Sequence, residues 1–207
     1  MIFLSPFLLS ISSNLYTLSV SLSYGIKKIQ LTKSNTILLA IITSIGMFLS
    51  MYLGKLILYL FQPVLGNIFG GILLSFIGVY LIVEYIRLEE KHAGYDTSYY
   101  FESSLKYKNM LENSNAINSY KSSHISIREC LNLSIVLMLN TLYISFASSI
   151  TGVSIGLSVF FNFIITIFSV YLGYFNSNIC ISKWFNKYSN LISSVILIIL
   201  GIYETFV

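Results

Sequence analysis

The sequence predicts an all-α membrane protein in which six transmembrane helices form two inverted three-helix repeats. Three observations favour this fold class. Of the 207 residues, 56% are hydrophobic and only 10% are charged, which is far more apolar than a soluble domain of this size needs. Several apolar stretches reach the roughly 20 residues that a helix needs to span a bilayer. Short motifs of the first half also return in the second half, in the same order.

The apolar stretches predict helices, because backbone amides in lipid must find their hydrogen-bond partners within the segment. Strands of a membrane barrel would be about 10 residues long and would alternate in polarity, whereas these stretches are longer and continuous. The fourth and sixth stretches are short and the fourth is polar, so the fourth has the weakest signal. The six predicted spans are Phe3–Tyr24, Thr36–Leu60, Val64–Ile86, Leu131–Ser149, Val153–Phe175 and Leu191–Val207.

The internal repeat relates the first three spans to the last three at nearly constant offsets. Three spans is an odd number, so the second copy must be inverted relative to the first. Inverted repeats recur in secondary transporters, with the binding site near the midplane where the copies meet. The matched pairs are Tyr16–Leu22 with Asn140–Phe146, Phe48–Gly54 with Ile167–Gly173, and Ile77–Tyr80 with Leu200–Tyr203.

The repeat divides the chain into three segments. Residues 1–86 form the first three-helix repeat, and residues 130–207 form the second. Between them, residues 87–129 are rich in Ser, Asn, Tyr and charge, and they predict a partly disordered cytoplasmic linker. Within this linker, Tyr99–Asn113 is a candidate surface helix.

The basic residues predict how the chain is oriented in the membrane. Eleven of the twelve Lys and Arg residues follow the first, third or fifth span, and the twelfth, Lys55, lies inside the second. The positive-inside rule places those loops in the cytoplasm. We therefore expect a multi-pass protein of the cell membrane with both termini extracytoplasmic. The net charge of +4 is then a topology signal, and the lipid bilayer, not nucleic acid, is the expected partner.

The first span is unusually polar for a helix in lipid. At 100° per residue, one face carries Ser12, Tyr16, Ser19 and Ser23, and the opposite face carries Ser10, Asn14, Thr17 and Ser21. A helix that is polar on two faces predicts neighbours on both sides, inside the bundle. The fourth span repeats one such arc with Ser134, Thr141, Ser145 and Ser148, and Asn140 lies at its edge.

Two interpretations of these polar residues stay open. Small hydroxyl residues let helices approach and hydrogen-bond, each contact contributing about 0.6 kcal/mol. Polar groups within a membrane also mark solute pathways. Asn162 of the fifth span matches Thr43 of the second, so the repeat predicts polar groups at equivalent depth. Gly66, Gly70, Gly71 and Gly78 predict close helix packing, and Lys55 and Glu204 are a candidate ion pair.

The sequence also argues against several chemistries. No acidic residue lies in the middle of a span, and carboxylates are the ligands that a divalent cation prefers. The acidic residues and histidines of the linker match no metal motif, so metal ligands stay unknown, and no cofactor is expected. The spans lack HExxH, GxSxG and paired aspartates, so we do not expect an enzyme. Cys130 and Cys180 predict reduced thiols at cytoplasmic helix ends.

Several motifs resemble those of a known family. Ser13–Tyr16 followed by Tyr24–Ile29 resembles the first-helix signature of the YtaF-type sporulation membrane proteins. Ile125–Glu129, Leu139–Leu142 and Ser149–Gly152 resemble the fourth helix of that family, and Gly70–Leu74 with Ile77–Tyr80 resembles the third. The family is related to the MntP-like manganese exporters, in the lysine-exporter-type group of six-helix proteins. The resemblance implies paired acidic positions in helices one and four, and here Tyr16 and Asn140 replace both.

The resemblance implies a sporulation-associated membrane protein similar to divalent-cation efflux transporters. With neutral groups at the site, the expected function is that of a divergent exporter of an ion or small polar solute. The alternative is a non-transporting scaffold used in spore formation, which would bind a membrane partner, or a second copy of itself, through linker 87–129. The candidate substrate-binding residues are Asn14, Tyr16, Ser19, Asn140, Ser145 and Asn162.

Overall fold

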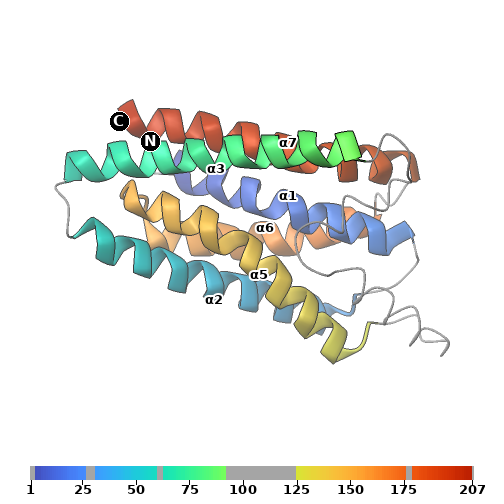
Figure 1. Cartoon of the computed structure of the whole chain (residues 1–207). Helices are drawn as coiled ribbons and strands as arrows, with labels where there is room; N and C mark the ends of the chain where they lie inside the picture. Colours follow the sequence, from blue (N-terminus) through green and yellow to red (C-terminus); the bar gives the residue numbers. More distant parts are fainter. Residues whose placement is uncertain (1–2, 27–30, 60–62, 92–124, 176–178, 207) are drawn as a thin grey trace.

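The computed structural model describes residues 3–26, 31–59, 63–91, 125–175 and 179–206, which consist of helices with short turns and helix caps (Figure 1). This confirms the all-α prediction for those residues. The helices are α1 (Leu4–Ile26), α2 (Lys33–Leu58), α3 (Pro63–Lys91), α5 (Ile127–Ile150), α6 (Ile155–Phe175) and α7 (Ile179–Phe206).

Five of these helices, α2, α3, α5, α6 and α7, are long and apolar enough to cross a bilayer. The prediction that the fourth span has the weakest signal is therefore wrong, because α5 meets this criterion and α1 is absent from the set. α1 carries Ser, Thr and Asn along most of its length, and its buried positions include many of these polar residues. Its polarity reflects burial against other helices and not exposure to water.

The helix ends follow local sequence signals. Thr32 caps α2 by accepting from the backbone N–H of Asn35 at 3.3 Å. Ser126 and Glu129 form a capping box at the start of α5, which satisfies two backbone donors that the helix leaves open. Gly152 adopts a φ of 81° in the turn between α5 and α6, a conformation that glycine adopts without steric cost.

Several helix boundaries differ from the sequence-based expectation. α7 begins at Ile179, whereas the sequence predicts a span that begins at Leu191. The sequence does not predict the first three turns of α7, because they are polar and aromatic and lack the apolar signal of a span. Trp184 is exposed there, and its ring packs against Tyr188 with centroids 5.3 Å apart. Both ends of segment 87–129 are helical, as α3 continues to Lys91 and α5 begins at Ile127. The candidate surface helix Tyr99–Asn113 lies outside the described residues.

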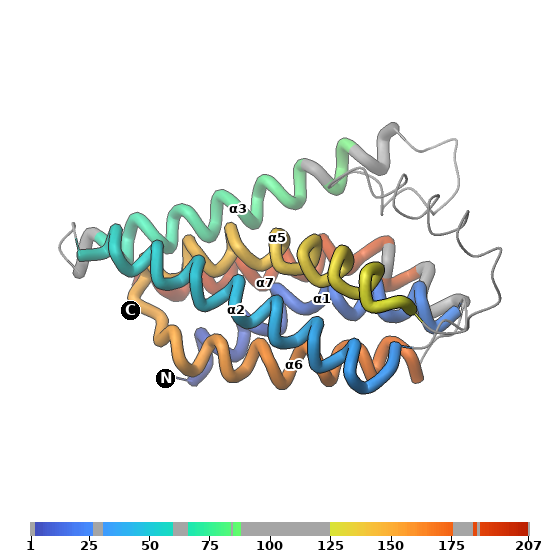
Figure 2. Tube along the Cα trace, turned by 90° about the horizontal axis from the view of Figure 1, so that it is seen from below, coloured from blue at the N-terminus to red at the C-terminus, as the bar shows by residue number. Residues whose placement is uncertain are grey.

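Both ends of the chain lie at the same end of the bundle, as the two perpendicular views show (Figures 1 and 2). The turn between α5 and α6 and the end of α2 also lie there. Among the described residues, all major helix contacts join one of the first three helices to one of the last three. The main pairs are α1 with α6, α2 with α5, and α3 with α7. The two halves of the sequence therefore interleave and do not form separate packed bodies.

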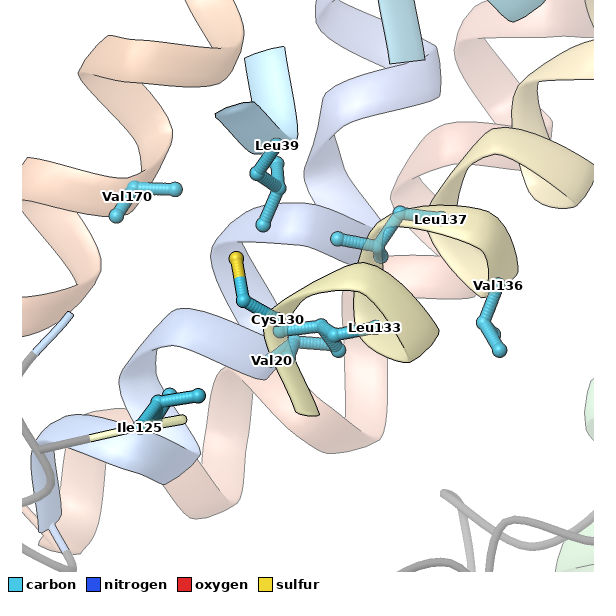
Figure 3. Packing of buried hydrophobic residues seen from close by; sticks show 8 residues of the cluster. All are labelled: Val20, Leu39, Ile125, Cys130, Leu133, Val136, Leu137 and Val170. Carbon is cyan, nitrogen blue, oxygen red and sulfur yellow. The ribbon is translucent and has the colours of Figure 1, made fainter. Parts of the chain in front are cut away.

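The apolar core divides into two clusters along the bundle. The first, named here the Val20 cluster, draws on α1, α2, α5 and α6 (Figure 3). The second, the Leu9 cluster, draws on α1, α2, α3, α5 and α7. The Val20 cluster comprises Val20, Leu39, Ile125, Cys130, Leu133, Val136, Leu137 and Val170. The Leu9 cluster comprises Leu9, Met47, Met51, Leu74, Ile144, Ala147, Leu197 and Leu200.

Glycines set the closest helix approaches, as the sequence predicts. A Cβ on Gly71 of α3 would lie 2.6 Å from the carbonyl oxygen of Gly201, and a Cβ on Gly78 would lie 2.8 Å from that of Ser194. Real Cβ atoms do not approach so closely, so only glycine allows α3 and α7 to touch backbone to backbone. Gly70 packs in the same way against Thr151, at the start of the turn after α5.

Candidate functional site

The two polar faces of α1 contact two different helices, which confirms the prediction that α1 has neighbours on both sides. On one face, the hydroxyls of Ser12 and Ser193 of α7 lie 2.9 Å apart. The hydroxyl of Ser193 also lies 3.0 Å from the carbonyl oxygen of Ser12. The opposite face, with Ser10 and Asn14, packs against α6.

Asn14 and Asn162 form the centre of the contact between α1 and α6. The side-chain amide of Asn14 donates to the side-chain oxygen of Asn162 at 2.8 Å, and it also reaches the carbonyl of Ser10 at 2.9 Å. The hydroxyl of Thr166 lies 2.7 Å from the side-chain oxygen of Asn14. The structure thus brings together two of the residues that the sequence singles out.

Asn162 extends this contact to a third helix. Its side-chain nitrogen donates to the hydroxyl of Ser44 of α2 at 3.3 Å, and its oxygen also accepts from Ser13 at 3.4 Å. Ser10 of α1 reaches the carbonyl of Ser158 of α6 at 3.1 Å. We name this group the polar layer; its members are Ser10, Ser13, Asn14, Ser44, Ser158, Asn162 and Thr166.

Three hydroxyls of the polar layer each face two acceptors. The single hydroxyl proton of Thr166 faces two oxygens at 2.7 Å, the side chain of Asn14 and the carbonyl of Asn162. Ser10 likewise faces the carbonyls of Pro6 and Ser158, and Ser13 faces the Ser10 carbonyl and the Asn162 side chain. A hydroxyl has one proton to donate, so each shares it between two acceptors.

The polar layer lies between the two apolar clusters along α1 and α2. On α1, Asn14 falls between Leu9 and Val20, and on α2, Ser44 falls between Leu39 and Met47. Asn14, Asn162 and Thr166 are at most 2% exposed. Asn14, Asn162 and Thr166 are therefore buried in the interior of their helices, away from the helix ends.

The other four candidate residues lie outside the polar layer. Tyr16 packs against the Val20 cluster, and Ser19 is buried on the same helix. Ser145 is buried and donates to the carbonyl of Thr141 within its own helix at 2.6 Å. Asn140 accepts from the hydroxyl of Tyr143 at 2.6 Å in an exposed contact, so it lies away from the buried network.

Sequence reasoning left most members of the polar layer unassigned to the site. Thr166 carries a local signal, because it follows Asn162 by one helical turn on the same face. Ser44 adjoins Thr43, which the repeat had matched to Asn162, but the hydroxyl of Thr43 points back to Leu39 and Ala40 of its own helix. Helical periodicity identifies a polar face, but it does not say which neighbouring helix that face contacts.

Charged groups play no part in the polar layer. Within the described residues, no group of three His, Cys, Asp or Glu side chains could hold a metal ion. The candidate ion pair of Lys55 and Glu204 does not form. Lys55 is exposed, whereas the side chain of Glu204 is 7% exposed and interacts with the hydroxyls of Ser5 and Thr151. Cys130 is a buried free thiol.

Comparison with known proteins adds no assignment to this geometry. No family model, no curated protein and no solved structure matches the chain.

Proposed function

We propose that the protein is a multi-pass membrane transporter that moves a monovalent cation or a small, donor-bearing polar solute past the polar layer. The single observation that carries this proposal is the buried polar layer enclosed by two apolar clusters. Burying polar groups near the middle of a membrane bundle costs free energy unless these groups have partners, and such groups mark solute pathways. The apolar clusters would close the pathway on either side.

Paired contacts support the proposal that the two halves are inverted repeats. Gly54 of α2 packs against Phe146 of α5, and Gly173 of α6 packs against Leu22 of α1. The sequence repeat matches these glycines to each other and these partners to each other. Exchanging the halves thus turns one contact into the other, and it turns the α1–α6 pair into the α2–α5 pair. A pseudo-twofold axis in the membrane plane has this effect.

The chemistry of the polar layer favours a weakly held ligand. Amide and hydroxyl oxygens replace part of the hydration shell of a monovalent cation or hydrogen-bond an ammonium-like solute. Divalent cations prefer carboxylate oxygens as ligands, and the polar layer contains no carboxylate. The resemblance to exporters of the YtaF and MntP-like type adds efflux to the proposal as the direction of transport and spore formation as its setting. Manganese itself is the less favoured cargo.

The interleaved helices limit how the pathway can open. The two sequence halves cannot rock as separate bodies, since each helix packs mainly on the other half. The helix pairs can instead shift against each other. The Asn162–Ser44 hydrogen bond joins the α1–α6 pair to α2 and, at 3.3 Å, is longer than the 2.8 Å bond within the pair. Opening would therefore begin between α6 and α2.

The test is solute flux through purified protein in lipid vesicles, with rubidium, methylammonium and manganese as the probes. We expect flux of rubidium or methylammonium above that of protein-free vesicles, and a loss of about tenfold or more in Asn162→Leu, because a group on the path then cannot bind the solute. Asn140→Leu, which removes an amide outside the polar layer, is the matched control and should retain flux. Flux no greater than that of protein-free vesicles for all three probes would favour the scaffold alternative.

A further inference from the structure

Glu204 is a buried acid at the end of the bundle that holds both chain termini. It lies on the last turn of α7 and is 7% exposed. The other acid whose side chain is described, Glu129, lies at the surface in the α5 capping box. The polar layer does not use Glu204, so its burial requires a separate explanation.

The described groups that interact with Glu204 are uncharged hydroxyls. Its carboxyl group interacts with the hydroxyl of Ser5 at the start of α1 and with that of Thr151 after α5. Among the described residues, the neighbouring stretches 4–9 of α1, 66–71 of α3 and 146–150 of α5 contain no titratable side chain. Lys55 of α2 is exposed at this end of the bundle, and Tyr203 precedes Glu204 on α7.

We propose that Glu204 is a proton-binding site, which holds a neutral carboxylic acid and exchanges its proton with the aqueous phase at this end of the bundle. A carboxylate withdrawn from water without a cation pays a large desolvation cost, which a bound proton removes. The neutral acid has one donor and further acceptor positions. It can donate to one of the hydroxyls of Ser5 and Thr151 and accept from the other.

Three unpaired buried hydroxyls of the described residues lie close in the sequence to Glu204 or to Thr151. Within the described residues, the buried side-chain oxygens of Ser148, Ser154 and Tyr203 have no hydrogen-bond partner. Each lies within three residues of Thr151 or Glu204 in the sequence, and Ser148 is fully buried. Because none of the three hydroxyls hydrogen-bonds to Glu204 or Thr151, they are unpaired polar groups at this end of the bundle and form no continuous hydrogen-bonded chain.

This inference does not depend on the proposed transport, because it concerns a protonation state that is measured without any flux. The experiment is infrared spectroscopy of the full chain in lipid nanodiscs, with Glu204→Gln as the variant and Glu129→Gln as the control. At neutral pH, we expect the C=O stretch of a protonated carboxylic acid in the wild type. The band should disappear in Glu204→Gln, persist in Glu129→Gln and fall reversibly as the pH is raised.

Two outcomes would overturn the inference. One is a wild-type spectrum at neutral pH that shows no protonated-acid band beyond that of Glu204→Gln. The other is loss of the band on addition of sodium at constant pH, which would make Glu204 a cation site. If Glu204→Gln does not fold, carboxyl-carbon isotope labelling of glutamate in the wild type gives the same answer. An isotope-shifted, pH-dependent acid band supports the inference, and its absence overturns it.

Discussion

The side-chain amide of Asn14 donates to the side-chain oxygen of Asn162 across 2.8 Å, and the two residues are separated by 148 positions in the sequence. This hydrogen bond joins the first helix to the fifth span at the centre of the bundle. Around it, hydroxyls of three helices complete the polar layer, with an apolar cluster on either side. The same contact can stabilise the fold and line a solute pathway. Measurements of unfolding free energy and of solute flux separate these two roles.

The first prediction concerns the energy of the Asn14–Asn162 contact. We expect Asn162→Leu to lower the free energy of unfolding by about 1–2 kcal/mol, because it leaves polar partners on α1 and α2 unsatisfied in a buried site. Asn14→Leu should have a similar effect. The double variant should lose less than the sum of the two, since contacting residues are coupled.

Reversible unfolding in mixed detergent measures these differences, and Asn140→Leu serves as the control, with an expected change below about 0.5 kcal/mol for a site away from the buried network. Strict additivity of the two single variants would show that the two amides do not interact.

The second prediction concerns the backbone contact between α3 and α7. Gly71→Ala places a methyl group 2.6 Å from the carbonyl oxygen of Gly201, so the helices must separate, at a cost of about 1–3 kcal/mol. Gly156→Ala is the matched control, because a Cβ on Gly156 of α6 has no neighbour within 4 Å. Thermal unfolding in detergent should show a lower midpoint for Gly71→Ala only. Equal midpoints for the two variants would mean that α3 and α7 are farther apart.

The third prediction concerns the orientation of the chain. Lys55 and Arg128 are both exposed, on α2 near the end that holds both termini and at the start of α5, respectively. In a background without Cys130 and Cys180, Lys55→Cys should react with a membrane-impermeant maleimide from outside intact cells. Arg128→Cys should react only after the cells are opened, because the basic loops face the cytoplasm. Labelling of both positions from the same side would contradict the transmembrane arrangement.

The sequence predicts the faces of the helices better than it predicts their partners. Helical spacing separates Ser12 from Ser10 and Asn14 on α1, and the structure places those groups against α7 and α6. Nothing in that spacing identifies Ser193 or Ser158 as the partner, because the choice of neighbour depends on packing across the whole bundle. The early start of α7 at Ile179 is missed for a related reason. Its first turns need not be apolar if they lie outside the bilayer.

The repeat also predicts more symmetry than the buried groups retain. Glycine contacts of the two halves correspond, as with Gly54 and Gly173. The polar layer has no equally polar counterpart, because the repeat matches Asn14 to Met138 and Thr166 to Met47. The backbone pattern survives such replacements because packing needs only suitable volume, whereas the location of a polar site depends on individual side chains.

The most direct test of the central claim is the reactivity of a thiol at position 44 in the vesicle-embedded protein. Ser44→Cys, made without Cys130 and Cys180, removes only the 3.3 Å contact of the polar layer with α2. If the polar layer lies on a solute pathway, a small impermeant methanethiosulfonate reagent will modify this thiol during flux, and flux will stop. If Ser44→Cys stays unmodified and flux continues while Arg128→Cys reacts fully, the polar layer is packing and the transport proposal is wrong.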